Sequence, residues 1–186
     1  MRKIFNIFLI AVIFLSNGCI KRDSMENINI YTSVYPIEYI TNWLYGDKST
    51  IHSIYPNGVI VDQYDLTEKQ LEDYSKADLF IFNGLGRDKN YVAPLFNYNK
   101  NLKIIDTTYT MEYTHGIEEL WLNPLNFLMM AQNIKNGLNE YINNHYLKEE
   151  IQQKYENLKI EVSNIDAKIK LISENTKNKK IVVSSD

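Results

Sequence analysis

The chain has a single cysteine, three histidines and no excess of positive charge among its 186 residues. One cysteine, Cys19, excludes an internal disulfide. The formal net charge of −3 excludes the basic surface on which nucleic-acid-binding proteins depend. Apolar residues make up 45% of the chain, which suits one compact domain with a sizeable core and argues against wholesale disorder.

Motifs for common catalytic sites are also missing. The segment from Asn83 to Gly86 is glycine-rich, but it lacks the third glycine of a dinucleotide-binding fingerprint, and no phosphate-binding Lys-Ser/Thr loop occurs. Cys19 stands too close to the N-terminus to serve as a Cys-His nucleophile in a folded site. Asp62 and Asp65 are near each other, but nothing around them supports the paired acids of a glycosidase. We therefore predict that the chain is not an enzyme.

Residues 1–18 have the parts of a secretory signal peptide. Two basic residues precede an apolar run from Ile4 to Leu15. This run is too short to span a bilayer as a permanent helix. The fold is therefore expected to begin after this segment.

Gly18 and Cys19 resemble the end of a bacterial lipobox, although Ser16 stands where leucine is usual. The resemblance implies that the Cys19 thiol is diacylated and that residues 19–27 form a polar tether on the membrane. Several acyl chains hold a protein on a membrane far better than one does. The alternative is an ordinary signal peptide with an incidental cysteine.

Apolar runs typical of β-strands alternate with helical patterns after the tether. This alternation predicts a parallel sheet with helices on its faces, and so an α/β lobe at 28–145. Thr67 and Gln70 form a capping box at one helix start, and Asn123 with Pro124 marks another. Functional groups in such folds gather at the carboxyl ends of the strands. The predicted strands are 28–34, 50–55, 77–82 and 102–105, and the predicted helices are 36–45, 67–75, 88–96 and 124–141.

A single apolar stripe with steps of three and four residues runs through 146–176 and predicts one helix about 40 Å long. Taken alone, the stripe fits a coiled coil. The other interpretation is a spine helix that spans two lobes, which we favour because an α/β lobe comes directly before it. Residues 177–186 have the pattern of a strand, and we expect them to begin a second lobe that the chain lacks. The stripe consists of Leu147, Ile151, Tyr155, Leu158, Val162, Ile165, Ile169 and Ile172.

Four motifs, in their order and spacing, resemble those of the solute-binding lipoproteins of zinc and manganese ABC importers. The resemblance covers residues 29–186, and it implies a two-lobed α/β fold that traps a metal ion between its lobes and docks on a permease. The motifs are Val61-Asp62-Gln63-Tyr64-Asp65, the strand and turn from Ala77 to Gly86, the loop from Glu118 to Pro124, and Val182-Val183-Ser184-Ser185-Asp186.

The resemblance also assigns metal-ligand positions, and here the chain departs from the family. Members of the family carry histidine in a Pro-His-x-Tyr-Glu loop, before Trp-Leu-(Asp/Asn)-Pro, and in a Val-Val-Ser-His-Asp strand. The matching positions hold Asp62, Glu119 and Ser185, of which the serine is the poorest ligand. His115 lies where zinc importers often carry a histidine-rich stretch, so it is a further candidate ligand.

Three explanations of this departure are open. Asp62 and Glu119, with help from His115, form a site rich in oxygen ligands, which favours manganese, calcium or magnesium over zinc. Alternatively, the protein keeps the fold and has lost the metal. The third explanation is that the chain is the truncated product of a decaying gene.

We therefore predict an extracytoplasmic, lipid-anchored solute-binding protein of a zinc or manganese importer. Its expected partners are Zn²⁺ or Mn²⁺, an ABC permease and the membrane, with no nucleic acid. The alternative is a surface lipoprotein without a transport role that uses the lobe or the long helix for protein contacts. Without a second lobe, the stripe at 165–172 lacks its cover, and we expect self-association through it.

Overall fold

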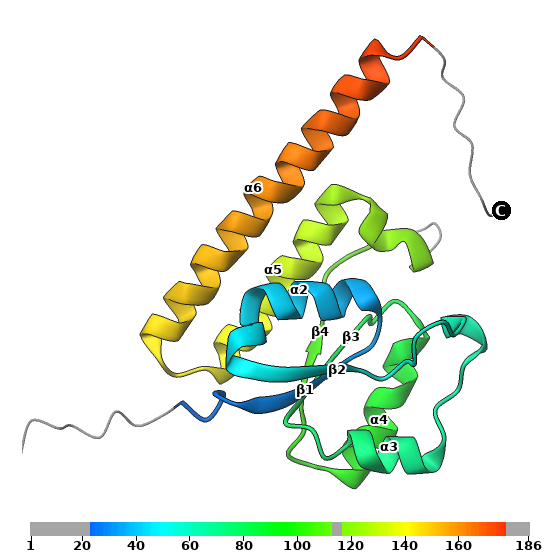
Figure 1. Ribbon diagram of the computed structural model, residues 1–186. Coiled ribbons are helices and arrows are strands. Elements are labelled where there is room, and N and C mark those ends of the chain that lie inside the picture. Colours follow the sequence, from blue (N-terminus) through cyan, green and yellow to red (C-terminus); the bar gives the residue numbers. More distant parts are fainter. Residues whose placement is uncertain (1–22, 113–116, 178–186) are drawn as a thin grey trace, which may run out of the picture.

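The structure, a computed structural model, describes residues 23–112 and 117–177. At its centre is a sheet of parallel strands in the order β2-β1-β3-β4 (Figure 1). The α/β fold with a parallel sheet, predicted from the alternating sequence patterns, is confirmed. The strands are β1 (Ile28–Thr32), β2 (Ser49–Ser53), β3 (Leu79–Phe82) and β4 (Lys103–Asp106).

Helices cover both faces of this sheet (Figure 1). Helices α2, α5 and α6 pack together on one face, and α3 and α4 pack together on the other. The α-helices of the described residues are α2 (Tyr35–Tyr45), α3 (Glu68–Tyr74), α4 (Val92–Tyr98), α5 (Pro124–Tyr141) and α6 (His145–Asn175). Short 3-10 helices are η1 (Gly46–Lys48), η2 (Val61–Gln63), η3 (Arg87–Tyr91) and η4 (Ile117–Leu122).

Two helix starts are fixed by the capping residues that the sequence identifies. The Thr67 hydroxyl accepts a hydrogen bond from Gln70 N at 3.3 Å, and the Gln70 side chain accepts one from Thr67 N at 2.9 Å. This reciprocal pair is the predicted capping box. At the start of α5, the Asn123 side chain accepts hydrogen bonds from the N–H groups of Leu125 and Asn126. The caps fix where the loops before α3 and α5 end.

Strand β3 lies at the centre of the core. All four of its residues are buried, because strands lie on both sides of it and helices cover both faces. Strand β2 is at the edge of the sheet, and its residues alternate between half-buried and exposed. The burial of every residue of β3 thus reflects its central position in the sheet. The alternating burial along β2 reflects its position at the edge.

Helix α6 extends far beyond the lobe (Figure 1). Its first part packs on α2 and α5. Its last part carries exposed apolar side chains: Ile165, Ile169 and Ile172 are 56%, 58% and 65% exposed. Within the two described ranges, no helix is both long and apolar enough to cross a membrane. The residues of α6 that are buried against the lobe are Leu147, Ile151, Tyr155 and Leu158.

Residues 23–27 differ from the free tether predicted for 19–27. Asp23 and Met25 are both buried, and Met25 belongs to the hydrophobic core. Asp23 reaches Asn143, which lies 120 positions away in the sequence. The local pattern of polar residues contains no sign of this partner, so sequence reasoning missed the contact.

Candidate functional site

A pocket of about 560 Å³ lies at the carboxyl edge of the sheet. Its walls come from the segments that follow β1, β2 and β3, together with Trp121 from η4. This is the edge where ligands bind in parallel α/β sheets, as the sequence analysis expected. Its apolar lining is Val34, Ile60, Val61, Leu85 and Trp121, and its charged lining is Asp62, Arg87, Asp88 and Lys89.

Asp62 lines this pocket from η2 and is exposed. Arg87, which begins η3, fixes the segment around Asp62. Its guanidinium donates a hydrogen bond to the Asp62 backbone carbonyl and a second one to the Asp65 carboxylate, with Nη2 and Oδ1 2.6 Å apart. An exposed ion pair of this kind adds at most about 1 kcal/mol to stability. The contacts of Arg87 matter instead for the shape of the site, because they hold together the two loops that border the pocket.

Asp88 is a buried carboxyl group in the pocket wall, only 2% exposed. The Tyr55 hydroxyl donates a hydrogen bond to Asp88 Oδ1 at 2.9 Å. Burial raises the pKa of Asp88, and the charge of Asp62 acts in the same direction, whereas polar contacts with Ser33 and Tyr55 oppose them. Although Ser33 lies close, neither its hydroxyl nor Asp88 Oδ2 makes a hydrogen bond of acceptable geometry within the described part. Sequence reasoning gave Asp88 no role of its own, because no residue close to it in the sequence indicates that its carboxyl group is buried.

An aromatic cluster supports the loop that carries Asp62. Tyr55 makes edge contacts with Tyr64 and Tyr91, at 6.0 Å and 6.4 Å between ring centroids. The Tyr91 hydroxyl donates to the Tyr64 carbonyl at 3.2 Å. Gln70 of the capping box donates to the Tyr64 hydroxyl at 2.8 Å. The loop is thus held by side chains from three separate segments, which rigidifies the wall that carries Asp62.

The glycine turn after β3 forms another wall. Gly84 N donates to Asp106 Oδ1 at 3.0 Å, and Leu85 N donates to the Asn83 side chain at 3.1 Å. The same Asp106 oxygen accepts hydrogen bonds from the N–H and hydroxyl groups of Thr108 at 2.8 Å. Asp106 therefore clamps the ends of β3 and β4 together and shapes the turn that borders the pocket.

The other predicted ligands are placed only in part. Glu119 lies in η4, two residues before the pocket residue Trp121, but its side chain is not described. Cys19, His115 and Ser185 lie outside the described residues. Among the described side chains, which do not include those of residues 113–119, no three of His, Cys, Asp or Glu are grouped so that they could hold a metal ion together. The described structure thus brings Asp62 and the segment of Glu119 to one pocket.

Comparison with known proteins gives relatives of one kind. The family model described as zinc-uptake complex component A, periplasmic, matches residues 30–186. A metal ABC transporter substrate-binding lipoprotein of Lactococcus lactis is 28% identical, over 97% of this chain and 63% of its own length. The manganese ABC transporter substrate-binding lipoprotein PsaA of Streptococcus pneumoniae is 24% identical, over 74% of this chain and 51% of its own length. The chain thus spans between half and two thirds of these relatives.

Solved structures show the same fold. Zn(II)-bound AdcA of Streptococcus pneumoniae superposes with a TM-score of 0.70 at 20% identity, over 82% of this chain and 34% of that one. A crystal structure of ZnuA gives a TM-score of 0.71 at 19% identity, over 82% of this chain and 61% of that one. Since the family model also matches residues 30–186, well over half of the chain, the chain belongs to the ZnuA family of zinc-uptake components.

Proposed function

We propose that the chain is the metal-binding component of a zinc or manganese ABC importer. The observation that carries the proposal is the position of Asp62, which lines the pocket at the carboxyl edge of the sheet together with Trp121 of η4. Relatives named as metal and manganese transporter lipoproteins support it. Because Asp62 and Glu119 offer oxygen ligands in place of imidazole, the site favours Mn²⁺ over Zn²⁺.

The pocket suits a cation in two respects. The Asp62 carboxylate is not used by Arg87, which binds the backbone carbonyl of Asp62 and the side chain of Asp65 instead. Trp121 and aliphatic residues line the same pocket, and apolar walls of this kind strengthen an ion–carboxylate contact. Asp62 then supplies a carboxylate from one wall and Glu119 a second one from the segment of η4.

Calorimetric titration with Mn²⁺ and Zn²⁺ tests this proposal. The protein is a soluble form that begins at Ile20, compared with Asp62→Ala and Glu119→Ala variants. We expect Mn²⁺ to bind more tightly than Zn²⁺ and each variant to weaken the binding by about tenfold or more, since even residues behind direct ligands have effects of that size. Asp73→Ala is the matched control, because Asp73 lies on α3 and pairs with Lys76 outside this pocket. A folded protein that binds neither ion contradicts the proposal.

We further propose that Cys19 is acylated and that the protein works at the extracytoplasmic face of the membrane, beside an ABC permease. The leader pattern supports this assignment, as do relatives that are named lipoproteins. Mass spectrometry of the N-terminal peptide from membranes of the producing cell tests it. We expect a mature chain that begins at Cys19 and carries acyl groups, and a Cys19→Ala variant that is released from the membrane.

The exposed end of α6 supports a third proposal, self-association through Ile165, Ile169 and Ile172. These side chains lie on one stripe, and each is more than half exposed. Sedimentation velocity of the soluble form is expected to show concentration-dependent dimers. An Ile165→Asn, Ile169→Asn double variant should be monomeric, whereas Ile160→Asn, an exposed position off the stripe, should leave the dimer intact. A protein that stays monomeric at high concentration removes this proposal.

A further inference from the structure

The first described residue, Asp23, is bound to the segment just before α6, which lies 120 positions later in the sequence. Asp23 is 9% exposed, and its carboxylate accepts three backbone hydrogen bonds. Oδ2 accepts from Asn143 N at 2.8 Å and from Asn144 N at 2.7 Å, and Oδ1 accepts from Met25 N at 2.9 Å. Asn144 is the N-cap of α6, so Asp23 sits at the positive end of that helix, where a carboxylate is stabilised.

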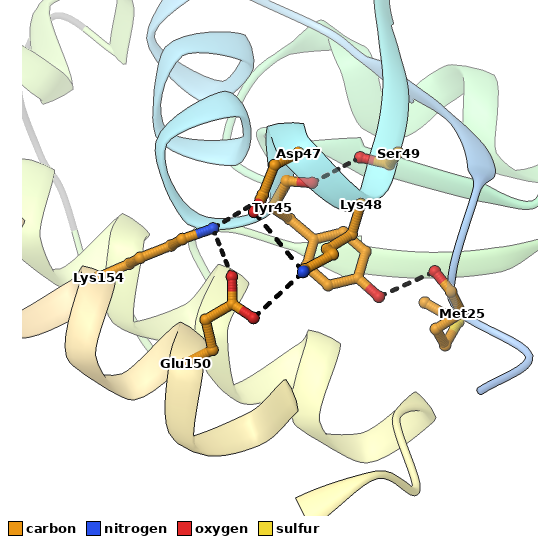
Figure 2. A network of polar contacts seen from close by, with 7 residues as sticks. All are labelled: Met25, Tyr45, Asp47, Lys48, Ser49, Glu150 and Lys154. Atoms are coloured by element: carbon orange, nitrogen blue, oxygen red, sulfur yellow. Dashed lines mark hydrogen bonds and ion pairs between the residues drawn. The ribbon is translucent and has the colours of Figure 1, made fainter. Parts of the chain in front are cut away.

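Met25 adds a second attachment to the same corner. Its side chain is fully buried, and its carbonyl accepts a hydrogen bond from the Tyr45 hydroxyl at 2.8 Å, as Figure 2 shows. Asn27 N donates to the Lys48 carbonyl at 2.6 Å. We call Asp23 and Met25, together with their partners Asn143, Asn144 and Tyr45, the N-terminal docking site.

Ion pairs join this corner to α6. Lys154 Nζ lies 2.6 Å from Asp47 and 3.1 Å from Glu150, and Lys48 Nζ lies 3.3 Å from Glu150 (Figure 2). The four side chains link the end of α2 and the start of β2 to the first turns of α6. The corner that carries the N-terminal docking site is therefore linked to α6 by side chains as well as by the backbone contacts of Asp23.

The docking site lies only four residues after Cys19. Four residues span at most about 14 Å even when fully extended. If Cys19 is acylated, its Cα lies at the membrane surface, so Asp23 is held within about 14 Å of that surface. If residues 19–27 formed a free polar tether, the lobe could take any orientation relative to the membrane. Docking of Asp23 and Met25 on the lobe restricts that orientation.

The same geometry fixes which way the lobe points. Strand β1 starts just after the docking site, and its other end leads to Val34 in the wall of the pocket. Helix α6 also starts at the docking site and rises for about 45 Å to its exposed end. In Figure 1 the described N-terminus and the start of α6 lie at the same side of the molecule. The pocket and the end of α6 both lie away from it.

We propose that the corner formed by the N-terminal docking site faces the lipid bilayer and that the pocket opens away from it. The proposal rests on the lipid anchoring proposed above and not on metal binding. In this orientation the pocket is turned away from a permease in the same membrane.

Fluorescence quenching on vesicles tests the orientation. With Cys19 acylated, the chain has no other cysteine, so one new cysteine gives a unique labelling site. Tyr146→Cys places a fluorophore at an exposed position, 79% accessible, beside the docking site. Asn57→Cys places it at an exposed turn beyond the carboxyl end of β2. The full lipidated chain is reconstituted in phosphatidylcholine–phosphatidylglycerol vesicles that contain lipids with a nitroxide on the headgroup.

We expect the nitroxide lipids to quench the label at position 146 several-fold more strongly than the label at position 57. Equal quenching at the two positions overturns the proposal. The control inserts twelve Gly and Ser residues between Arg22 and Asp23, which lengthens the tether and leaves every described residue unchanged. This insertion is expected to remove the difference between the two labels, and a difference that survives it would overturn the proposal.

The test separates this inference from the metal proposal. A chain that mass spectrometry shows to be without acyl groups overturns both the anchoring and the orientation, while the calorimetric result for Mn²⁺ is unaffected. Conversely, a lipidated chain that binds no metal still gives the two quenching values, and these alone decide the orientation.

Discussion

Replacing Gly84 with alanine is expected to lower the free energy of unfolding by about 3 kcal/mol or more. A Cβ atom at this position would lie 2.1 Å from Asp106 Oδ2 and 2.4 Å from Asp106 Cγ. The carboxylate cannot move aside without cost, because it accepts hydrogen bonds from Gly84 N and from both polar groups of Thr108. Either the turn shifts or the clamp between β3 and β4 opens.

Urea unfolding followed by circular dichroism measures this effect, with Gly46→Ala as the matched control. At Gly46 a Cβ would approach only the Asn42 side chain, at 3.1 Å, and the backbone φ of −61° suits alanine. We expect the control to change stability by less than about 1 kcal/mol. If Gly84→Ala proves as mild as Gly46→Ala, the close approach of the turn to Asp106 is wrong.

The Gly84 variant also has a consequence for binding. Asn83, Leu85 and Gly86 line the pocket beside it, so a shift of the turn displaces one wall. We therefore expect the variant to weaken any Mn²⁺ binding as well as the fold, measured at a temperature where the variant remains folded. Asp62 is carried by a different loop, so its contribution to binding should persist in the variant.

Replacing Asp23 with alanine is expected to cost about 2–4 kcal/mol of stability at neutral pH. The substitution leaves the N–H groups of Met25, Asn143 and Asn144 without their carboxylate acceptor. It also removes the negative charge at the start of α6. Thermal and urea unfolding of the soluble form that begins at Ile20 measure the loss, and Glu112→Ala, an exposed acidic position in a loop, serves as the control.

The effect of Asp23 should depend on pH with a defined sign. Burial alone would raise the pKa of Asp23, but the three backbone N–H groups and Lys148 hold it below its ordinary value near 4. A carboxyl group with a lowered pKa in the folded state stabilises the fold fully above the unfolded pKa. That stabilisation is lost as the pH falls through the folded pKa. The stability difference between the native chain and Asp23→Ala should therefore be constant from pH 7 to about 5 and shrink below about 4.

A pH-independent difference between these two proteins would contradict the ionised state of Asp23. A difference near zero at pH 7 would contradict the docking of Asp23 itself and, with it, the basis of the proposed orientation. The stability experiment therefore comes before the vesicle experiment. Together, the stability and vesicle experiments distinguish a segment that is bound to the lobe from one that only lies near it.

Features that depend on neighbours in the sequence were predicted well. The capping box of Thr67 and Gln70 and the N-cap of Asn123 form as the sequence indicates, because their hydrogen bonds join residues two or three positions apart. The apolar run at 77–82 predicted a strand, and β3 forms there. The extent of α6 also follows from the sequence, since its apolar stripe repeats at helical steps over the whole helix.

Features of the candidate site depended on distant contacts, and the sequence indicated them only in part. The family resemblance pointed to Asp62 and Glu119, and the structure brings Asp62 and the segment of Glu119 to one pocket. No sequence pattern indicated that Asp88 is buried, and its hydrogen-bond donor Tyr55 lies 33 positions earlier. The role of Arg87 likewise depends on a loop 22–25 positions before it.

The sequence alone predicts most of the helices and strands, the parallel α/β class, the uncovered stripe at 165–172 and the family, because these follow from local periodicity, caps and ordered motifs. The folded chain is needed to show that residues 23–27 dock on the lobe and that Asp88 is buried in a pocket wall. Both features have the same cause. Burial of a side chain is set by what packs against it, and those partners lie on segments that only the folded chain brings together.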